Sequence, residues 1–201
     1  MEHYMFIDDE KFKEKEKINK FDLSYIKWNT KECKYVPLNE NEKKGLEVLV
    51  LNDLPDGMKI LNSIYKIIRS WNTSSVNPQG HIALMLQSKS FLRSIIFIYG
   101  KNLRSSAREV FSYGSLTEYG NIEGEEERQG EVRLSINIAY PKSQVSREIR
   151  EEGIIGGAGS NTRHSMISYA FNKLNCKKVT TQVVSDKAYK ALLDLGFVVT
   201  K

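Results

Sequence analysis

The sequence predicts a mixed α/β (α+β) fold, because helical and strand-like apolar patterns occur in one stretch of chain. Between Met166 and Leu174, apolar residues recur at intervals of three and four, as on a helix face that packs on a core. Between Glu131 and Tyr140 they alternate with other residues, as in a strand with one buried face. A β-branched run over 179–184 predicts a second strand. We therefore expect helices packed on a sheet.

The length and composition are those of one globular unit. The chain has 201 residues, of which 40% are hydrophobic and 27% charged, enough for one sizeable core. Residues 8–17 alternate acidic and basic side chains, which indicates a solvated helix or a mobile arm. We expect 1–44 to form an N-terminal extension or arm packed on the core, and 45–201 to form the main domain.

The main domain begins with a strand and a helix. The run 46–51 is typical of a strand, and Pro55-Asp56-Gly57 ends it. A helical stripe follows over 60–71. Two apolar runs, 81–86 and 91–99, are separated by four polar residues and predict an antiparallel hairpin.

The next segment is polar and leads to a strand with two distinct faces. We interpret 100–130 as a polar connection whose acidic part, Glu123 to Glu127, is either solvated or attracts a cationic amine. In the following strand, one face is expected to be core and the other the wall of a site. The expected core face consists of Val132, Leu134, Ile136, Ile138 and Tyr140. Residues 142–152 predict an extra helical turn or a flap.

A glycine cluster at 153–159 precedes the long helix. Ser160 and Asn161 follow it, and such residues are typical of helix starts. Glycines at a helix N-terminus let an anion approach several backbone N–H groups, and the helix dipole favours negative charge there. The pattern therefore predicts either a structural turn or a phosphate site. The chain has no Gly-Lys-Ser/Thr, which argues against a P-loop NTPase.

The ordered set of features in the C-terminal part resembles one known family. It comprises Gly157-x-Gly159, a helix of about four turns, Asn175, a strand, and a second helix that ends in Leu195-Gly196-Phe197. This set is similar to the GNAT superfamily of acyl-CoA-dependent N-acetyltransferases, and the similarity covers roughly the last 70 residues. Within the family, the branch of ribosomal-protein and small-molecule N-acetyltransferases is the most similar. It also has a leucine four residues before the final glycine, as at Leu192 here, and a Tyr-Ala-Phe-like helix centre, as at Tyr169-Ala170-Phe171.

The resemblance implies a fold, a reaction and ligands. The fold would be a mixed, mostly antiparallel twisted sheet flanked by helices, GNAT-like over 45–201. Acetyl-CoA would be the acyl donor, and the acceptor a primary amine on a small molecule, a peptide or a protein N-terminus, attacking directly in a ternary complex. The residues expected to bind the donor are Ile138, Gly157, Ala158, Gly159, Ser160 and Asn161.

The sequence departs from the family pattern at two positions. Many relatives carry a tyrosine four residues before the final glycine, as the acid for the departing thiolate, and this chain has Leu192 there. The Gln/Arg position of the pyrophosphate loop is Ile154, whereas Arg150 fits a competing register with Gly153. Arg150 is then a candidate to approach a CoA phosphate.

The remaining candidates are titratable side chains. For the general base, Glu131 is the first choice and Glu118 the second, because N-acylation requires a neutral amine. Tyr189 is the candidate to replace the missing acid. His164 is expected to contact a phosphate, cap the helix or lie on the surface, and His81 has no assignable role.

Net charge and cysteine content limit the classes of partner and of site that we expect. The net charge of +5 suits an anionic cofactor, a ribosome surface, nucleic acid or plain solubility. Cys33 and Cys176 have no metal-like spacing and no apolar segment is membrane-length, so we expect a cytoplasmic monomer or homodimer without metal or membrane. The alternative function is a catalytically degenerate GNAT-like module that binds nucleic acid or a protein partner.

Overall fold

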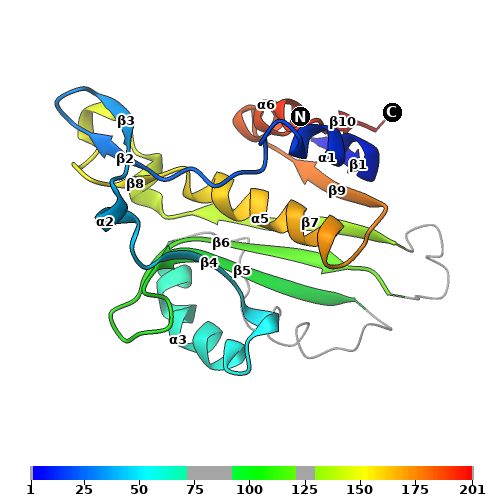
Figure 1. Cartoon of the computed structure of the whole chain (residues 1–201), viewed down its shortest axis with the longest axis horizontal. Coiled ribbons are helices and arrows are strands. Elements are labelled where there is room, and N and C mark those ends of the chain that lie inside the picture. The colour runs from blue at the N-terminus through cyan, green and yellow to red at the C-terminus, as the bar shows by residue number, and fades with distance from the viewer. Residues whose placement is uncertain (1, 72–91, 121–129, 201) are drawn as a thin grey trace.

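The computed structural model describes residues 2–71, 92–120 and 130–200, which form an α+β fold with two sheets (Figure 1). The larger sheet has seven strands in the order β10-β1-β9-β7-β6-β5-β4, and all its pairs are antiparallel except β7 with β9. The strands are β1 (His3–Asp8), β4 (Leu46–Val50), β5 (Arg93–Lys101), β6 (Glu109–Glu118), β7 (Glu131–Ala139), β9 (Lys178–Val183) and β10 (Val198–Val199). The smaller sheet has the order β3-β2-β8, with β2 (Ile26–Asn29), β3 (Lys34–Pro37) and β8 (Ile155–Gly156).

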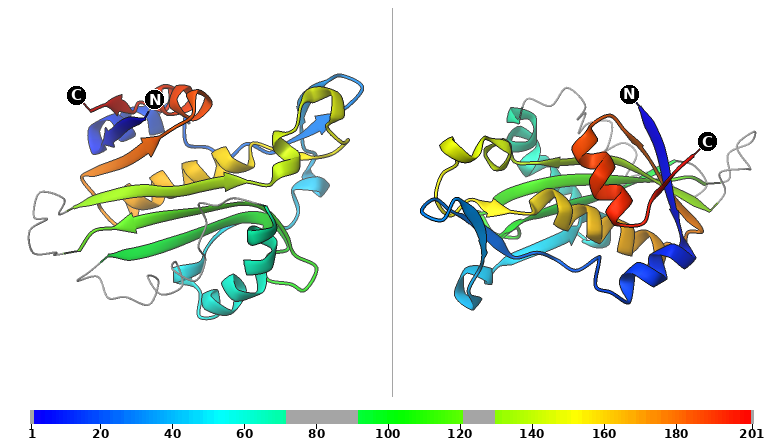
Figure 2. Two further views of the ribbon diagram at one scale, coloured as in Figure 1. Left: turned by 180° about the vertical axis from the view of Figure 1, so that it is seen from behind. Right: turned by 90° about the horizontal axis from the view of Figure 1, so that it is seen from above.

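Helices cover both faces of the large sheet. The described helices are α1 (Asp9–Glu16), α2 (Glu40–Lys43), α3 (Gly57–Ser70), α5 (Ala158–Asn172) and α6 (Asp186–Asp194). Short 3₁₀ turns lie at Leu51–Asp53, Pro141–Gln144 and Arg147–Ile149. Helices α1, α5 and α6 lie on one face and α3 on the other (Figure 2). The described residues contain no helix with the length and apolar character of a membrane span.

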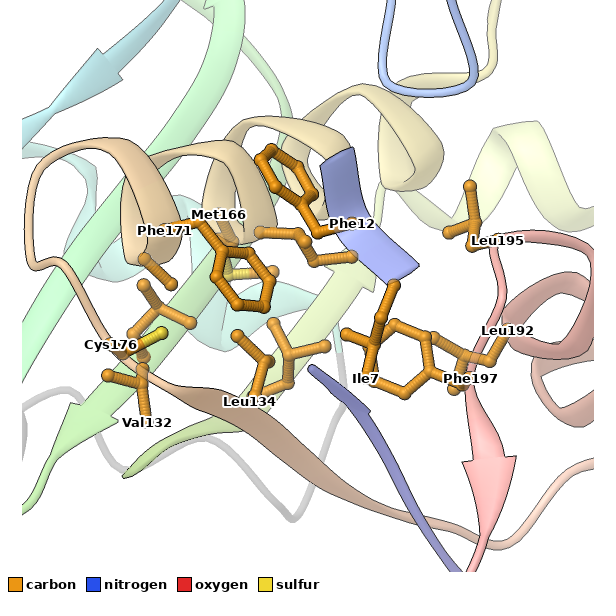
Figure 3. Packing of buried hydrophobic residues seen from close by; sticks show 14 of the residues in the cluster. Ile7, Phe12, Val132, Leu134, Met166, Phe171, Cys176, Leu192, Leu195 and Phe197 are labelled. Atoms are coloured by element: carbon orange, nitrogen blue, oxygen red, sulfur yellow. The ribbon is translucent and has the colours of Figure 1, made fainter. Parts of the chain in front are cut away.

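The two faces have separate cores. The first packs α1, α5 and α6 on the sheet and includes Phe12, Met166 and Leu192 (Figure 3). The second packs α3 on β4 to β7 and includes Ile64 and Tyr113. The stripe predicted over 60–71 supplies this second core, because Ile60, Leu61, Ile64 and Ile68 are all buried. Both cores bury the apolar faces that the periodicity predicted.

The N-terminal residues take part in both sheets. Strand β1 lies between β9 and β10 and pairs antiparallel with each. Strands β2 and β3 form the small sheet with β8. The two chain ends meet, since Thr200 donates its backbone N–H to the carbonyl of Tyr4 at 2.9 Å. A strand from the start of the chain is therefore an internal strand of the large sheet, and β10 from its C-terminal part is the edge strand.

Strand β7 contains a bulge that divides its apolar residues between the two faces. Ser115 pairs with Ile136 but Leu116 pairs with Leu134, which leaves Ser135 as the extra residue. Val132 and Leu134 therefore belong to the first core, whereas Ile136 and Ile138 pack against the second. The prediction of one continuous core face from Val132 to Tyr140 was wrong, because strict alternation assumes a strand without a bulge.

Other expectations were met, missed or lie outside the described residues. The left-handed Asn175 is confirmed by its φ of 51°. The polar connection predicted over 100–130 was wrong in its first part, because β6 is a central strand there. Residues 112–116 of β6, Ser-Tyr-Gly-Ser-Leu, are buried, although three of them are small or polar. The strand 81–86, with His81, and the acidic loop 123–127 lie outside the described residues.

Candidate functional site

The N-terminus of α5 opens into a cleft of about 540 Å³. Gly157 caps the helix with a φ of 67°, in the left-handed region, and no side chain caps the first turn. Among the described residues, nothing accepts a hydrogen bond from the N–H groups of Ala158, Gly159 or Ser160, and all three residues line the cleft. We call this end of α5, formed by Gly157 to Ser160, the helix mouth. It offers three backbone N–H donors without a described partner at the positive end of the helix dipole.

Close packing holds this helix mouth in place. The hydroxyl of Ser112 on β6 donates to the carbonyl of Ala158 at 2.9 Å and also contacts the hydroxyl of Thr162. A Cβ on Gly114 would lie 2.7 Å from the sulfur of Met166, so glycine there lets α5 approach β6. A Cβ on Gly156 would lie 2.3 Å from the ring of Tyr35. The small residues of β6 and β8 therefore fix where the cleft lies.

The described lining of the cleft carries positive charge and no carboxylate. Its 14 lining residues include Arg163 and Lys187 but neither aspartate nor glutamate. Arg163 donates to the hydroxyl of Ser160 at 3.2 Å, its Nε is buried without a hydrogen-bond partner, and no described carboxylate lies within ion-pair distance of it. Burial lowers the pKa of its guanidinium. A desolvated cation at the positive end of a helix is costly without an anion.

Arg163 was missed in the sequence analysis. It lies four residues after Gly159, and residues at this spacing share a helix face. The side chain of a helical residue also points back toward the N-terminus of its helix. An arginine one turn after a glycine loop was therefore a usable signal, and it would have placed this guanidinium at the loop.

The cleft continues into a gap between β7 and β9. These parallel strands pair only from Glu131 with Lys178 to Leu134 with Thr181, although β7 runs on to Ala139. A second cavity of about 240 Å³ lies where they separate, and it shares Asn137 and Arg163 with the cleft. The helix mouth and the strand gap thus form one continuous surface.

The predicted donor-binding residues divide into two groups. Gly157, Ala158, Gly159 and Ser160 line the cleft together. Asn161 instead is fully buried, and its side-chain amide makes two hydrogen bonds, of 2.7 and 2.8 Å, with the backbone of Ser24. Its side chain thereby holds the segment that precedes β2 against α5.

Ile138 lies on β7 beside the gap, but its side chain packs in the second core. Tyr140 donates its backbone N–H to Phe111 on β6 at 2.7 Å. Successive residues of a strand direct their backbone N–H and C=O groups to opposite sides. The backbone groups of Ile138, two residues before Tyr140, therefore also face β6, and the backbone groups of Asn137 and Ala139 face the gap. The backbone available to a ligand is therefore that of the two neighbours of Ile138.

The predicted catalytic residues do not lie in the cleft or the gap. Glu131 forms an ion pair with Lys178, and Glu118 pairs with Arg93 at 2.8 Å. Tyr189 packs against His3, with the ring centroids 4.4 Å apart and the ring planes tilted by 33°. The structure thus brings none of these three beside the helix mouth.

Other candidates have structural contacts. The guanidinium of Arg150 lies 4.7 Å from the ring centroid of Trp28 and 5.3 Å from that of Tyr35, and it donates to the carbonyl of Val145. Arg150 therefore packs in the small sheet. Leu192 is buried and lines the gap. Cys176 is buried in the first core, and this burial raises the pKa of its thiol to about 12.

His164 predicts a pH-dependent stability. Burial lowers its pKa, although its Nδ1 lies 3.1 Å from the carbonyl of Asp22. The unfolded state, with an ordinary pKa of about 6.5, therefore binds the proton more readily than the folded state. We expect the stability to fall as the pH drops from about 6.5 toward the lowered pKa. Chemical denaturation of the wild type and His164→Gln at a series of pH values tests this, and equal pH profiles would contradict it.

Neither a known protein nor a metal-binding group among the described residues assigns a function to this site. No family model matches the chain, and no curated protein matches it significantly. No group of three or more metal-ligating side chains occurs within residues 2–71, 92–120 and 130–200. A functional conclusion therefore depends on the geometry of the cleft and the gap.

Proposed function

We propose that this chain is an acyl-CoA-dependent N-acyltransferase of the GNAT type, which transfers an acetyl group from acetyl-CoA to a primary amine in a ternary complex. One observation carries the proposal: an open helix mouth with free N–H groups and cations continues into the gap between two separating strands. A diphosphate suits the mouth, and a narrow uncharged arm suits the gap. Acyl-CoA combines both in one molecule.

The strand order supports the same proposal. The large sheet is antiparallel except for β7 and β9, and this parallel pair separates beside the N-terminus of α5. The opening for an uncharged arm therefore lies next to the site for a diphosphate.

The residues present fit a CoA diphosphate. The N–H groups of Ala158, Gly159 and Ser160 would donate to its oxygens, and Arg163 would supply the charge that Ile154 cannot. The donor brings a thioester carbonyl, which is the electrophile. Backbone groups of Asn137 and Ala139 face the gap, where an N–H can stabilise the oxyanion that forms on this carbonyl.

Proton transfer is the step with the least support from side chains. Leu192 lines the gap at the place of the family's tyrosine, and Glu131 and Tyr189 are engaged elsewhere. We propose that the chain acts chiefly by orienting a neutral amine against the thioester, so that the amine nitrogen bonds to the acyl carbon as the carbon-sulfur bond breaks. The ammonium proton then leaves with the thiolate or to water.

The leucine at this position also favours the second candidate, a catalytically degenerate GNAT-like module that binds nucleic acid or a protein partner. Thiol release from acetyl-CoA across amines, peptides and aminoglycosides, alongside a salt-dependent nucleic-acid shift assay, distinguishes the two. Thiol release supports the transferase. A salt-dependent shift without thiol release supports the module, and absence of acetyl-CoA binding in a calorimetric titration contradicts the transferase.

Replacement of Arg163 tests the diphosphate assignment. Arg163→Gln removes the charge but keeps hydrogen-bonding groups, and we expect acetyl-CoA to bind about tenfold to a hundredfold more weakly, since hydrogen bonds to charged groups contribute about 1.5–3 kcal/mol. Arg104→Gln is the matched control, because Arg104 is exposed and lines no described cleft. Titration calorimetry at two salt concentrations measures the change. Unchanged affinity would remove Arg163 from the site.

A further inference from the structure

A separate cleft of about 270 Å³ lies on the sheet face opposite α5 and α6. Val132, Leu134 and Val179 are buried under α5. Because side chains alternate between the faces of a strand, Arg133 and Thr180 point away from that core and line this cleft. The cleft therefore adjoins the paired part of β7 and β9, just before the strands separate.

Among the described residues that line this cleft, Arg133 is the charged side chain without an ion pair. Of the described charged residues that line it, Glu131 and Lys178 neutralise each other in an ion pair. Arg133 donates to Oε1 of Gln182 at 2.9 Å and has no ion pair with any carboxylate in the described part of the chain. A half-buried guanidinium bonded only to an amide retains donors for a planar anion.

The contact between Arg133 and Gln182 connects the two cavities. Thr181 is the last residue of β9 that pairs with β7, so Gln182 is the first beyond the pairing. Gln182 lines the strand gap, whereas Arg133 lines the opposite cleft. A ligand that binds Arg133 in the opposite cleft therefore lies next to a side chain that lines the gap.

We infer that this cleft binds the acceptor, and that Arg133 selects an amine that also carries a carboxylate, as in an amino acid or a short peptide. The inference rests on the proposed function, which places the thioester in the gap. The carboxylate pairs with the guanidinium and the amine points toward the gap. The amine nitrogen then forms a bond to the acyl carbon, the carbon-sulfur bond breaks, and the free thiol of CoA leaves with one proton.

The test compares each of a panel of L-amino acids and dipeptides with its own C-terminal amide. The two members share the amine and differ in the anionic charge. Thiol release gives kcat/KM for each, and the ratio of acid to amide defines the preference. Comparing this ratio between wild type and Arg133→Gln cancels the intrinsic reactivity of each amine. Arg104→Gln is again the control, and calorimetry gives the acetyl-CoA affinity of every variant.

We expect the acid-to-amide ratio to fall about tenfold to a hundredfold in Arg133→Gln for the preferred pair. The affinity for acetyl-CoA should be unchanged, the kcat/KM for the amide should fall much less than that for the acid, and Arg133→Lys should retain part of the preference. A ratio that Arg133→Gln leaves unchanged, an equal loss for both members, or release from neither member although acetyl-CoA binds would each overturn the inference. Absence of acetyl-CoA binding in the wild type would instead overturn the proposed function.

Discussion

Ser160→Asp is expected to weaken acetyl-CoA binding by about a hundredfold or more without weakening the fold. Ser160 is in the first turn of α5, lines the cleft and accepts a hydrogen bond from Arg163. A carboxylate there would pair with Arg163 and repel a diphosphate. Loss of the charge-assisted bonds together with this repulsion lowers the affinity by about a hundredfold or more.

The same substitution has the opposite effect on stability. Negative charge in the first turn of a helix contributes about 0.3–1 kcal/mol of stability. We therefore expect an unchanged or slightly higher melting temperature, by about 1–4 °C for a chain of this size. Calorimetric titration and thermal denaturation of the same sample measure both quantities. A general structural defect would lower both, so only the anion site predicts opposite directions.

Ser160→Ala is the matched control, because it removes the hydroxyl without adding charge. Its affinity for acetyl-CoA should stay within about tenfold of wild type, since a neutral hydrogen bond contributes about 0.5–1.5 kcal/mol. If Ser160→Asp bound acetyl-CoA as well as Ser160→Ala does, the diphosphate would not lie at this helix mouth.

The sequence predicted the helix mouth but not what completes the site around it. Local signals placed the glycines, the helix and the following strand, because capping and periodicity depend on neighbouring residues. Arg163 was recognisable only once its orientation toward the mouth was considered. The pairing of Arg133 with Gln182 joins two strands that are far apart in sequence. No local pattern encodes such a contact.

Strand β7 shows why a correct element does not guarantee correct faces. Its bounds followed from alternation, but the bulge at Ser135 turns Ile136 and Ile138 to the other side of the sheet. The bulge is set by pairing with β6, a strand that was missed because Ser112 and Ser115 are buried polar residues within it. The missed strand β6 and the wrong faces of β7 thus have one cause, because the pairing with β6 determines where the bulge lies.

The N-terminal segment provides the second large effect, through Phe12. It is the only buried residue of α1 and lies near Phe171 in the first core (Figure 3). Its ring centroid is 4.5 Å from that of Phe171 and 4.9 Å from that of Phe21. Phe12→Ala would leave a cavity at the centre of the first core. We expect it to lower the free energy of unfolding by about 3–5 kcal/mol, and the melting temperature by about 6–20 °C.

This substitution distinguishes an integral segment from an independent arm. If α1 and β1 belong to the cooperative unit, Phe12→Ala lowers the single unfolding transition of the whole chain, and Phe12→Leu does so by a smaller amount. Ile18→Ala is the control, because its side chain is 59% exposed. If the segment were a separate arm, the main transition would not move and only a small early transition would change. Calorimetry resolves the two outcomes. Because β1 pairs with β9, which borders the gap, a loss of the whole transition would also show that packing of Phe12 stabilises the donor site.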